Sequence, residues 1–439
     1  MSHPLIKLVR DQKNGIMRGI VSLCSANRFV LQAAMKRARG NEEYVLIEAT
    51  ANQVNQFGGY TGMKPADFVS FVHTIAEEQG FNKGRLILGG DHLGPLTWSR
   101  LSEKEAMDNA SELIRGYVLA GFTKIHIDTS MKLADDAADK RLSDEVIAQR
   151  GALLCKVAEE TYFDLKKELP DAAPLVYVIG SEVPVPGGAH HNDEGISVTS
   201  SENFKNTIDA FEKSYNDFGL REAFERVIAV VVQPGVEFSD SMIMEYDRAK
   251  ASKLIDALKD YRSIVFEGHS TDYQTQENLR YMVEDGIAIL KVGPALTFAL
   301  REALFSLELI EHELSNIYRF TPSDFINTLE KEMVDNTSFW IKHYHGSEQD
   351  KEFKRKYSYS DRCRYYLPVK AVDDSVHRLL DNLSKTEIPM QLISQYMPIQ
   401  YEKVQAGRIT SSPEELLMDR VIDCVDQYAF ACTGDKAYR

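Results

Sequence analysis

Acidic and imidazole side chains stand where short apolar runs of the sequence end. Asp91 and His92 follow the run RLILGG, and His269 follows SIVFEG, each within a turn that contains glycine. Imidazole nitrogen and carboxylate oxygen are ligands that zinc prefers, and manganese accepts them too. A divalent ion held there would polarise a carbonyl group of a substrate, and a carboxylate beside it would carry protons. These residues predict a divalent-metal site, with zinc as the expected ion and manganese as the alternative.

Other polar side chains occupy similar positions at the ends of further apolar runs. Asp128, Glu182 and Lys291 are, with Asp91, the candidates for catalysis. Any one of these residues, taken alone, is more simply explained as a helix cap or a hydrogen-bonded buried group. For His126, core packing is an equal alternative to a role at the site, but the number of such residues favours a shared site. The candidate substrate-binding residues are Glu48, Asn52, Gln53, His126, Ser270, Thr271 and Asp272.

The elements that must position these side chains alternate between β-branched runs and amphipathic helical stretches as far as Pro294. Such alternation is typical of βα units on a parallel sheet, and eight of them match a (β/α)8 barrel, the TIM barrel. An open doubly wound sheet is the alternative, but no GxGxxG follows the first strand and polar residues close nearly every strand. The expected strands are 19–26, 44–50, 85–92, 124–130, 175–182, 226–235, 263–270 and 288–294.

Amphipathic helices are expected between the strands at 65–79, 103–120, 144–167 and 203–218. From Phe320 the alternation stops, and the remaining sequence is helical in pattern and rich in aromatic and charged residues. We therefore expect a barrel over residues 1–318 and a helical C-terminal extension over 319–439 that packs on it. Within the extension, the highly charged stretch GSEQDKEFKRK is predicted to be a solvated loop.

Composition limits the classes of function. The chain has 439 residues and a net charge of −15, with 44% hydrophobic and 27% charged residues, proportions typical of a globular protein. The negative charge disfavours nucleic acid and anionic membranes as partners, because polyanions require a basic surface. The five cysteines are scattered without a CxxC pair, and no apolar run is long enough for a membrane span or a secretion signal. We expect a cytoplasmic protein.

Long motifs at the predicted strand ends resemble those of the Z-type (GatZ/KbaZ) subunit of D-tagatose-1,6-bisphosphate aldolase. The resemblance extends over nearly the whole chain, including the C-terminal part, and stretches of this length are far more specific than a short pattern. The motifs are LIEATANQVNQFGGYTGMKPADF, LGGDHLGP, YVIGSEVPVPGG, VVVQPGVEF, HSTDYQT, LKVGPALTFALREA and YSYSDRCRYY.

The resemblance carries expectations about activity and partners. That family is similar in its barrel to the metal-dependent class II aldolases, and its members are described as subunits that bring a catalytic Y-type partner to full activity and stability. Older naming called them tagatose-6-phosphate kinases, and related proteins are associated with ketose 4-epimerase activity. The expected partners are a ketohexose or ketohexose phosphate, a Y-type aldolase subunit, or further copies of the chain.

The resemblance to class II aldolases also implies roles for individual residues. Their proton carrier followed by a metal ligand matches Asp91 and His92. Their late ligand, which a small-residue phosphate loop follows, matches His269 with Ser270 and Thr271.

The match is incomplete at one metal ligand. The intermediate histidine of those aldolases has only Gln233 as a counterpart here. An amide oxygen is a weaker zinc ligand than imidazole. Glu182 or Asp128 is then expected to complete the metal shell, with Gln233 as the third candidate.

Three functions are compatible with these residues. The first is a metal-dependent ketose 4-epimerase that breaks and remakes the C3–C4 bond of tagatose, fructose or their 6-phosphates. The second is a non-catalytic subunit that stabilises and activates a Y-type aldolase. The third, a tagatose-6-phosphate kinase, is disfavoured because the sequence contains neither a GxxxxGK[ST] loop nor a kinase-type glycine-rich loop. The carboxylates and lysine at the expected site favour the first function.

Overall fold

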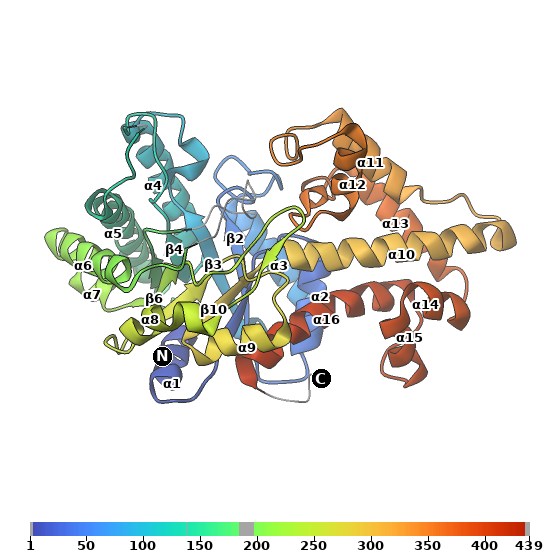
Figure 1. Cartoon of the computed structure of the whole chain (residues 1–439), viewed down its shortest axis with the longest axis horizontal. Coiled ribbons are helices and arrows are strands. Elements are labelled where there is room, and N and C mark those ends of the chain that lie inside the picture. The colour runs from blue at the N-terminus through green and yellow to red at the C-terminus, as the bar shows by residue number, and fades with distance from the viewer. Residues whose placement is uncertain (1–2, 138, 184–196, 435–439) are drawn as a thin grey trace.

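The structure of the protein is a computed structural model that describes residues 3–137, 139–183 and 197–434. Within these ranges, eight parallel strands close a barrel in the spatial order β1-β10-β9-β6-β5-β4-β3-β2 (Figure 1). The predicted (β/α)8 barrel is thereby confirmed. The barrel strands are β1 (Ile20–Leu23), β2 (Val45–Thr50), β3 (Leu86–Leu93), β4 (Lys124–Ile127), β5 (Val176–Ile179), β6 (Val227–Val232), β9 (Val265–Gly268) and β10 (Ile287–Val292).

Each barrel strand overlaps the stretch predicted for it, but most end before the predicted carboxyl end. In β4 the ladder ends at Ile127, because the next residues turn locally: the Asp128 carboxylate accepts hydrogen bonds from the backbone N–H and hydroxyl of Ser130. The sequence does not predict the short antiparallel hairpin of β7 (Glu237–Phe238) and β8 (Ile243–Met244). Strands of two residues are too short to produce an alternating pattern.

The barrel interior consists of two layers, because alternate residues of each strand point inward. Near the amino-terminal ends of the strands the layer is apolar and includes Leu46 and Ile289. Helix α1 (Pro4–Lys13) closes this end, since Leu5 and Val9 pack against the same apolar cluster. At the opposite end the inward side chains are largely ionisable, and that end is the mouth of the barrel.

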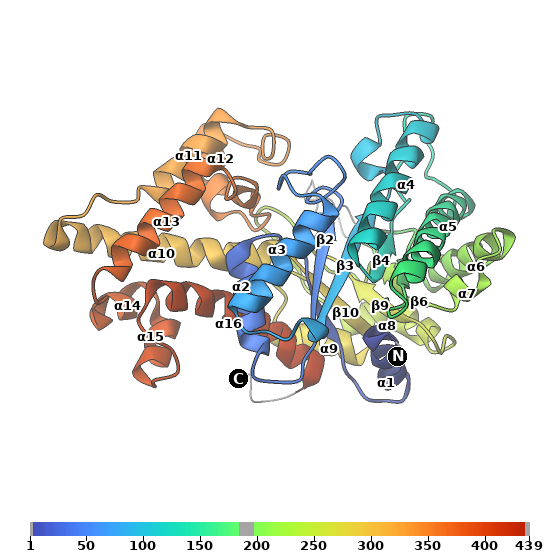
Figure 2. The same ribbon diagram turned by 180° about the vertical axis from the view of Figure 1, so that it is seen from behind.

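Helices surround the barrel (Figures 1 and 2), and α3 to α6 match the four predicted helices. Local signals set their ends: at α4, Ser102 and Glu105 form a reciprocal capping box. No helix in the described ranges is both long and apolar enough to cross a membrane. The remaining elements are α2 (Arg28–Ala38), α3 (Pro65–Glu78), α4 (Glu103–Ala120), α5 (Asp144–Glu168), α6 (Ser201–Asp217), α7 (Arg221–Phe224), α8 (Arg248–Leu258), α9 (Gln276–Glu284), α10 (Pro294–Tyr318), α11 (Phe325–Asp335), α12 (Glu348–Tyr357), α13 (Lys370–Ser384), α14 (Met390–Tyr396), α15 (Pro398–Gln405) and α16 (Pro413–Thr433), with the 3-10 turns η1 (Lys83–Arg85), η2 (Pro95–Trp98) and η3 (Arg362–Tyr365).

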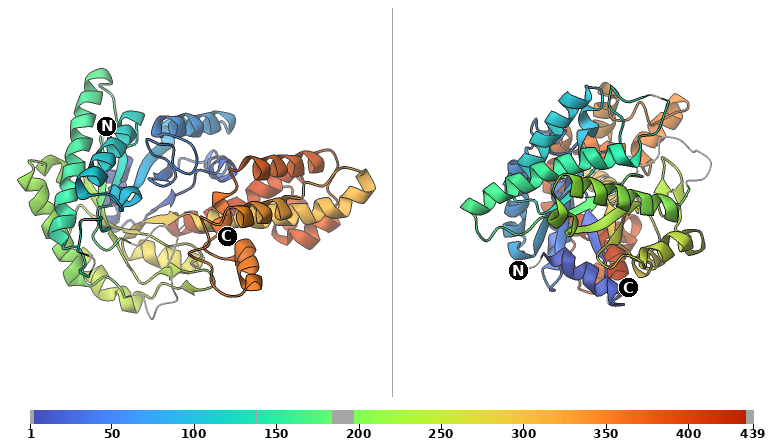
Figure 3. Two further views of the ribbon diagram at one scale, coloured as in Figure 1. Left: turned by 90° about the horizontal axis from the view of Figure 1, so that it is seen from above. Right: turned by 90° about the vertical axis from the view of Figure 1, so that its left-hand side faces the viewer.

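The C-terminal helices leave the barrel and return to it. Helix α10 runs outward from the barrel, and α11 to α15 lie around its far part (Figures 1 and 3). Helix α16 then runs back along α10 and packs against α2, α9 and β1, and its Cys432 carbonyl accepts a hydrogen bond of 2.9 Å from the Gly19 N–H. The last described helix thus lies in the ring around the barrel, although it follows residue 318 in sequence. The division of the chain at 318/319 stays a prediction.

The charged stretch GSEQDKEFKRK forms helix α12, so its prediction as a solvated loop is wrong. Ser347 and Asp350 make a reciprocal capping box at its start, and a basic last turn offsets the negative end of the helix dipole. The helix buries one residue, Arg355, which pairs with Glu330 at 2.5 Å. A helix that buries so little side chain has no apolar stripe for a sequence pattern to detect.

Candidate metal centre and active site

Three histidines meet at the mouth of the barrel, two from adjacent strands and one from across the barrel. His92 lies in β3, His126 in β4 and His269 directly after β9, and the centroids of their rings are 4.9 to 5.2 Å apart. Asp91 joins them: one ligand atom from each of these four buried residues lies within 4.8 Å of the others. This is the arrangement expected of ligands that surround a single metal ion.

Each imidazole is held by a carboxylate through one of its ring nitrogens. Nδ1 of His92 lies 2.8 Å from Asp128, and Nδ1 of His126 lies 2.9 Å from Asp91. Asp128 can receive the Nδ1–H of His92, which fixes that ring and leaves its other nitrogen free to bind a metal. Nδ1 of His126 also accepts the backbone N–H of His92 at 3.1 Å, which fixes the second ring. In the described structure Nε2 of His126 is buried without a hydrogen-bond partner. The cost of such an orphaned atom would be removed by an ion, so the residues fit a divalent metal.

His269 completes this pattern from the opposite side of the barrel. Its Nε2 lies 3.0 Å from Oε1 of Glu267, which is two residues earlier on the same face of β9. Burial, followed by the charge of Lys291, holds the pKa of His269 well below its usual value, and burial lowers the pKa of His126. The rings of His126 and His269 are therefore neutral at pH 7, the form that ligates metals.

A layer of buried ion pairs lies directly beneath the histidines. The ammonium group of Lys124 bridges Glu48 at 2.6 Å and Glu267 at 2.7 Å, and all three side chains are fully buried. Burial opposes the positive charge of Lys124, yet Glu267 and Glu48 keep its pKa above the ordinary value. Ser22 donates a further hydrogen bond of 2.6 Å to Glu48.

Lys291 connects this layer to the metal-binding cluster. Its ammonium group contacts Asp91 and lies 3.3 Å from Glu267 and 3.6 Å from Glu48. Burial alone would raise the pKa of Asp91, but His92 and Lys291 hold it well below its usual range, so it is ionised.

The charges of the two layers do not cancel. The two layers hold the carboxylates of Glu48, Asp91, Asp128 and Glu267 and the ammonium groups of Lys124 and Lys291; Asp128 lies beside His92, and the other three carboxylates lie beside the lysines. Two negative charges are left over, which a divalent cation would balance. Because uncompensated buried charge is costly, the charge balance supports a metal independently of the histidine geometry.

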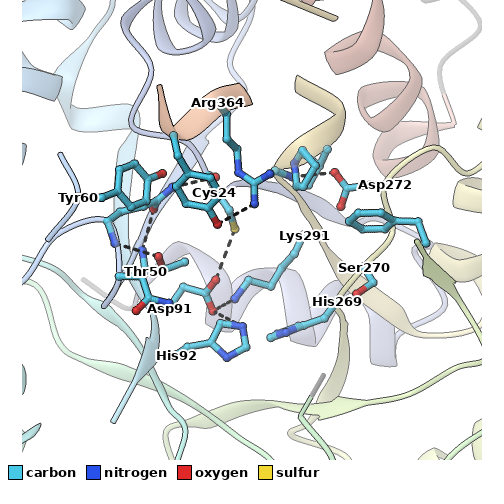
Figure 4. A pocket seen from close by; sticks show the side chains of 17 residues that line it. Cys24, Thr50, Tyr60, Asp91, His92, His269, Ser270, Asp272, Lys291 and Arg364 are labelled. Atoms are coloured by element: carbon cyan, nitrogen blue, oxygen red, sulfur yellow. Dashed lines mark hydrogen bonds and ion pairs between the residues drawn. The ribbon is translucent and has the colours of Figure 1, made fainter. Parts of the chain in front are cut away.

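The cluster forms one wall of a pocket at the barrel mouth (Figure 4). Asp91, His92, His269 and Lys291 lie on one side of the view, and Arg364 lies on the opposite side. The other polar lining residues include Cys24, Thr50, Asn52, Gln53, Tyr60, Ser270, Asp272 and Tyr365. A small polar molecule in the pocket would thus contact both the ligand cluster and the C-terminal part of the chain.

The backbone around the cluster adopts unusual conformations. His92 and Ser270 have positive φ angles of 48° and 52°, a region that costs non-glycine residues energy and is found at functional sites. Gly94 follows in an extended conformation, and a Cβ atom there would lie 1.8 Å from the Asp128 carbonyl oxygen. Glycine therefore allows the end of β3 to approach the end of β4, which brings His92 within reach of the Asp128 carboxylate.

Most of the residues predicted for the site meet at this mouth. Asp128 and Glu48 lie beside or beneath the ligand cluster, and His126 belongs to it. Asn52 and Gln53 line the pocket, as do Ser270, Asp272 and Lys291.

Three predicted residues have other contacts. Glu182 accepts hydrogen bonds from Asn203 at 2.7 Å and from Arg141 at 3.2 Å, and it is not among the described groups of the cluster. The Gln233 side chain accepts the N–H of Gly235 at 2.8 Å.

Thr271 is fully buried, and its hydroxyl donates to the Lys291 carbonyl at 2.6 Å. The roles predicted for Glu182, Gln233 and Thr271 stay predictions. The third imidazole stands instead in His126, on a different strand from Gln233.

Two polar residues of the mouth, Lys124 and Glu267, are not among the predicted site residues. They occupy inward positions two residues before His126 and His269, so strict alternation along β4 and β9 would have identified them. Arg364 and Tyr365 belong to the motif YSYSDRCRYY, whose arginine and tyrosine residues the sequence leaves open between a phosphate clamp and a packed charged helix, with the packed helix favoured. No local pattern predicts that this turn, η3, reaches the barrel mouth.

Comparison with known proteins agrees with this geometry. Residues 5–433 match the family model described as D-tagatose-1,6-bisphosphate aldolase subunit GatZ/KbaZ-like. A crystal structure of a probable tagatose 6-phosphate kinase from Sinorhizobium meliloti 1021 is 41% identical, covers 94% of this chain and 100% of its own, and superposes with a TM-score of 0.85.

More distant structures have low sequence identity to the chain and superpose on it poorly. The fructuronate-tagaturonate epimerase UxaE from Cohnella laeviribosi has 11% identity and a TM-score of 0.44, over 94% of this chain and 81% of that one. The YdjI aldolase from Escherichia coli K12 has 12% identity and a TM-score of 0.41, over 84% and 96%. Since the family model extends over nearly the whole described sequence, the chain belongs to the GatZ/KbaZ-like family of D-tagatose-1,6-bisphosphate aldolase subunits.

Proposed function

We propose that the chain is itself an enzyme, a divalent-metal-dependent 4-epimerase of tagatose, fructose or their 6-phosphates that works by retro-aldol cleavage. His92, His126 and His269 would hold the ion, and Asp91 lies beside them. A divalent ion, with zinc expected and manganese the alternative, would supply a Lewis acid that polarises the ketose carbonyl group.

The reaction requires a proton acceptor at the C4 hydroxyl group. When that proton leaves, the electron pair of the C3–C4 bond moves toward the C2 carbonyl, and C4 becomes an aldehyde. Asp91 lines the pocket and is ionised, so its carboxylate is the group we assign to accept the proton. The aldehyde then turns over, C3 attacks its opposite face, and the proton returns to the C4 oxygen with inverted configuration.

Lys291 supports the same step from the other side of Asp91. Its buried ammonium group lies between Asp91 and Glu267 and lines the pocket. A fixed positive charge there stabilises negative charge that develops on the substrate oxygens as the C–C bond breaks. The same charge also orients the Asp91 carboxylate toward the pocket.

The observation that carries the proposal is the open, pocket-facing cluster of ionisable groups. A subunit that only stabilises a partner has no use for three imidazoles and a net negative cluster buried at a barrel mouth, because these groups destabilise the fold unless metal or substrate satisfies them.

The test is an assay of the purified chain alone. Protein stripped with a chelator and reloaded with zinc or manganese is incubated with tagatose, fructose and their 6-phosphates, and C4 inversion is followed by chromatography. We expect turnover that depends on the metal and falls about 10²-fold or more in Asp91→Asn. Asp108→Asn, which removes one partner of an exposed surface ion pair with Lys104, is the matched control and should retain activity.

The second candidate function is the accessory role implied by the family description. If that role is the whole function, the metal-loaded wild-type chain will invert none of these sugars. Asp91→Asn will then support a Y-type aldolase as well as the wild type does. This pair of results would refute the epimerase.

A further inference from the structure

Besides Lys291, the pocket lining contains a second positively charged side chain, Arg364, on the wall that faces the ligand cluster (Figure 4). The residue belongs to η3, in the C-terminal part of the chain. This turn directly follows Asp361, which has a positive φ of 45°. One side of the catalytic pocket is therefore supplied by sequence well outside the barrel strands.

Neighbouring groups hold the guanidinium group in a fixed position. Its Nη1 donates to the carbonyl oxygens of Ser360 and Asp361, the latter at 2.9 Å, and its Nη2 donates to the Tyr365 hydroxyl at 3.0 Å. The guanidinium carbon also lies 4.4 Å from the centroid of the Tyr365 ring. Tyr60, from the loop after β2, packs edge-on against Tyr365 at 4.8 Å. Such a preorganised group loses little entropy when a ligand binds.

The charge of Arg364 has no direct acidic partner. Among the described residues, no carboxylate oxygen lies within 4.0 Å of its guanidinium nitrogens, whereas nearby Arg301 has Asp361 at 3.6 Å. These hydrogen bonds of Arg364 leave its Nε–H and one Nη2–H available to a ligand. Neither nitrogen is among the buried atoms that lack a hydrogen-bond partner. The residue lines the pocket.

The other place where a barrel of this kind binds anions is already occupied. The N–H groups at the start of α10 would normally attract a phosphate. Here the Asp272 carboxylate accepts the N–H groups of Gly293 at 3.0 Å and Ala295 at 2.8 Å. An anionic ligand is thus excluded from this helix terminus and is left with Arg364 as the cation on the distal wall.

We propose that Arg364 binds an anionic terminal group of the substrate, so that the preferred substrates are ketoses with a phosphate ester or a carboxylate at C6. This inference rests on the proposed function for the nature of the sugar. The carbonyl end of the sugar faces the histidines and Asp91, and the charged end faces Arg364. Arg364 is a binding residue and takes no part in bond cleavage.

The variant pair Arg364→Met and Arg378→Met tests this assignment. Arg378 is an exposed residue of α13 that does not line the pocket. Calorimetric titration of the zinc-loaded full chain measures the Kd of tagatose 6-phosphate and of tagatose. We expect the wild type and Arg378→Met to bind the phosphate at least about 10-fold more tightly than the neutral sugar, and Arg364→Met to lose that preference.

Titration with tagaturonate distinguishes the two anions. The ligand whose affinity falls more in Arg364→Met identifies the terminal group, and a similar fall for both supports a site for either. If neither affinity changes, or if tagatose loses as much affinity as the anions, the proposal is overturned. Wild-type protein that binds neutral tagatose as tightly as both anions would also overturn it.

Two further measurements keep the outcomes separate. Arg364→Lys retains the charge without the planar fork and should keep part of the preference, so it replaces the methionine variant if thermal melting shows that the latter is unfolded. Because binding is measured without turnover, a chain that binds the phosphate through Arg364 but inverts no sugar refutes the epimerase and not the anion site. Epimerisation with unchanged kcat/KM for the phosphate in Arg364→Met would refute the anion site and not the epimerase.

Discussion

The two ends of the barrel interior are built from the same strands and hold opposite kinds of side chain. In β10, Ile289 belongs to the apolar layer that α1 covers, while Lys291, the next inward residue, belongs to the ion pairs of the mouth. In β2 the corresponding pair is Leu46 and Glu48. The change from apolar to charged occurs within one inward step on each strand.

This contrast separates the part of the barrel that stabilises the fold from the part to which we assign the proposed chemistry. The apolar layer gains free energy by removing surface from water. The charged layer costs desolvation energy that ion pairs seldom return in full. The second layer is therefore explained by the metal and the substrate that it can hold, and each of the following experiments tests this contrast.

The largest expected effect follows from removing a single charge in the ionic layer. Lys124→Met leaves Glu48 and Glu267 without the ammonium group that bridges them. We expect a loss of about 3–5 kcal/mol in the free energy of unfolding, because the two buried carboxylates then share only the more distant ammonium group of Lys291. Urea denaturation of chelator-treated protein measures it, with exposed Lys104→Met as the control. A stability equal to that of the wild type would show that the layer is not held by its charges.

The next effect is stabilisation by the ion itself. Zinc at a concentration 100-fold above its Kd should raise the unfolding free energy by about 2.7 kcal/mol, because it binds only the folded site. His126→Ala should abolish both the gain and the bound metal, measured by thermal denaturation and metal analysis. His377→Ala, an exposed histidine, should change neither. Full metal occupancy in His126→Ala would place the ion elsewhere.

A smaller effect is expected in the apolar layer. Ile289→Val removes one methylene group from a fully buried side chain and should cost about 0.5–1.5 kcal/mol. Metal occupancy should remain that of the wild type, as measured on the same samples, because the layer does not touch the ligands. A variant that loses metal would show that the two layers are coupled.

The smallest effect concerns a partly buried acid in α10 that has no ion-pair partner among the described residues. Glu308 in α10 accepts the Ile326 N–H at 2.7 Å, and burial, reinforced by Glu311, raises its pKa to about 7. The folded state therefore holds a proton more tightly than the unfolded chain, so this contribution to stability is complete below about pH 4.5 and is lost as the pH rises through 7.

Glu308→Gln should consequently match the wild type at pH 5 and exceed it at pH 8, by less than about 1 kcal/mol because the side chain is partly exposed. Thermal melting at both pH values measures the difference, and exposed Glu313→Gln on the same helix is the control. A gain that is equal at both pH values would rule out the titration of Glu308 as its cause.

The sequence predicts the fold well because strands that are buried on both faces appear as short runs of β-branched residues, which can be recognised without knowledge of the tertiary structure. All eight barrel strands and the helices α3 to α6 follow from such patterns. Helix α12 and the β7–β8 hairpin do not: the helix buries only Arg355, and each strand of the hairpin has two residues. Elements with little buried surface leave no periodic signal.

The site is predicted in part for a similar reason. Strand ends identify Asp91, His92 and His269, since loops follow directly. His126 lies inside β4, where alternate side chains point into the barrel or away from it. Only the closed barrel shows that His126 points inward, toward the other two imidazoles. Arg364 reaches the pocket through tertiary packing of the C-terminal helices, which no spacing in the sequence encodes.

Helix α16 has a consequence for the synthesis of the protein. Its Tyr428 hydroxyl donates to the Thr271 carbonyl at 2.8 Å, and the Thr271 hydroxyl donates to the Lys291 carbonyl. The loop after His269 and the strand that carries Lys291 are thus joined through a helix that follows all the barrel strands in the chain. A nascent chain therefore contains every barrel strand before it contains this helix, so these two hydrogen-bonded connections at the barrel mouth form only after α16 has been synthesised.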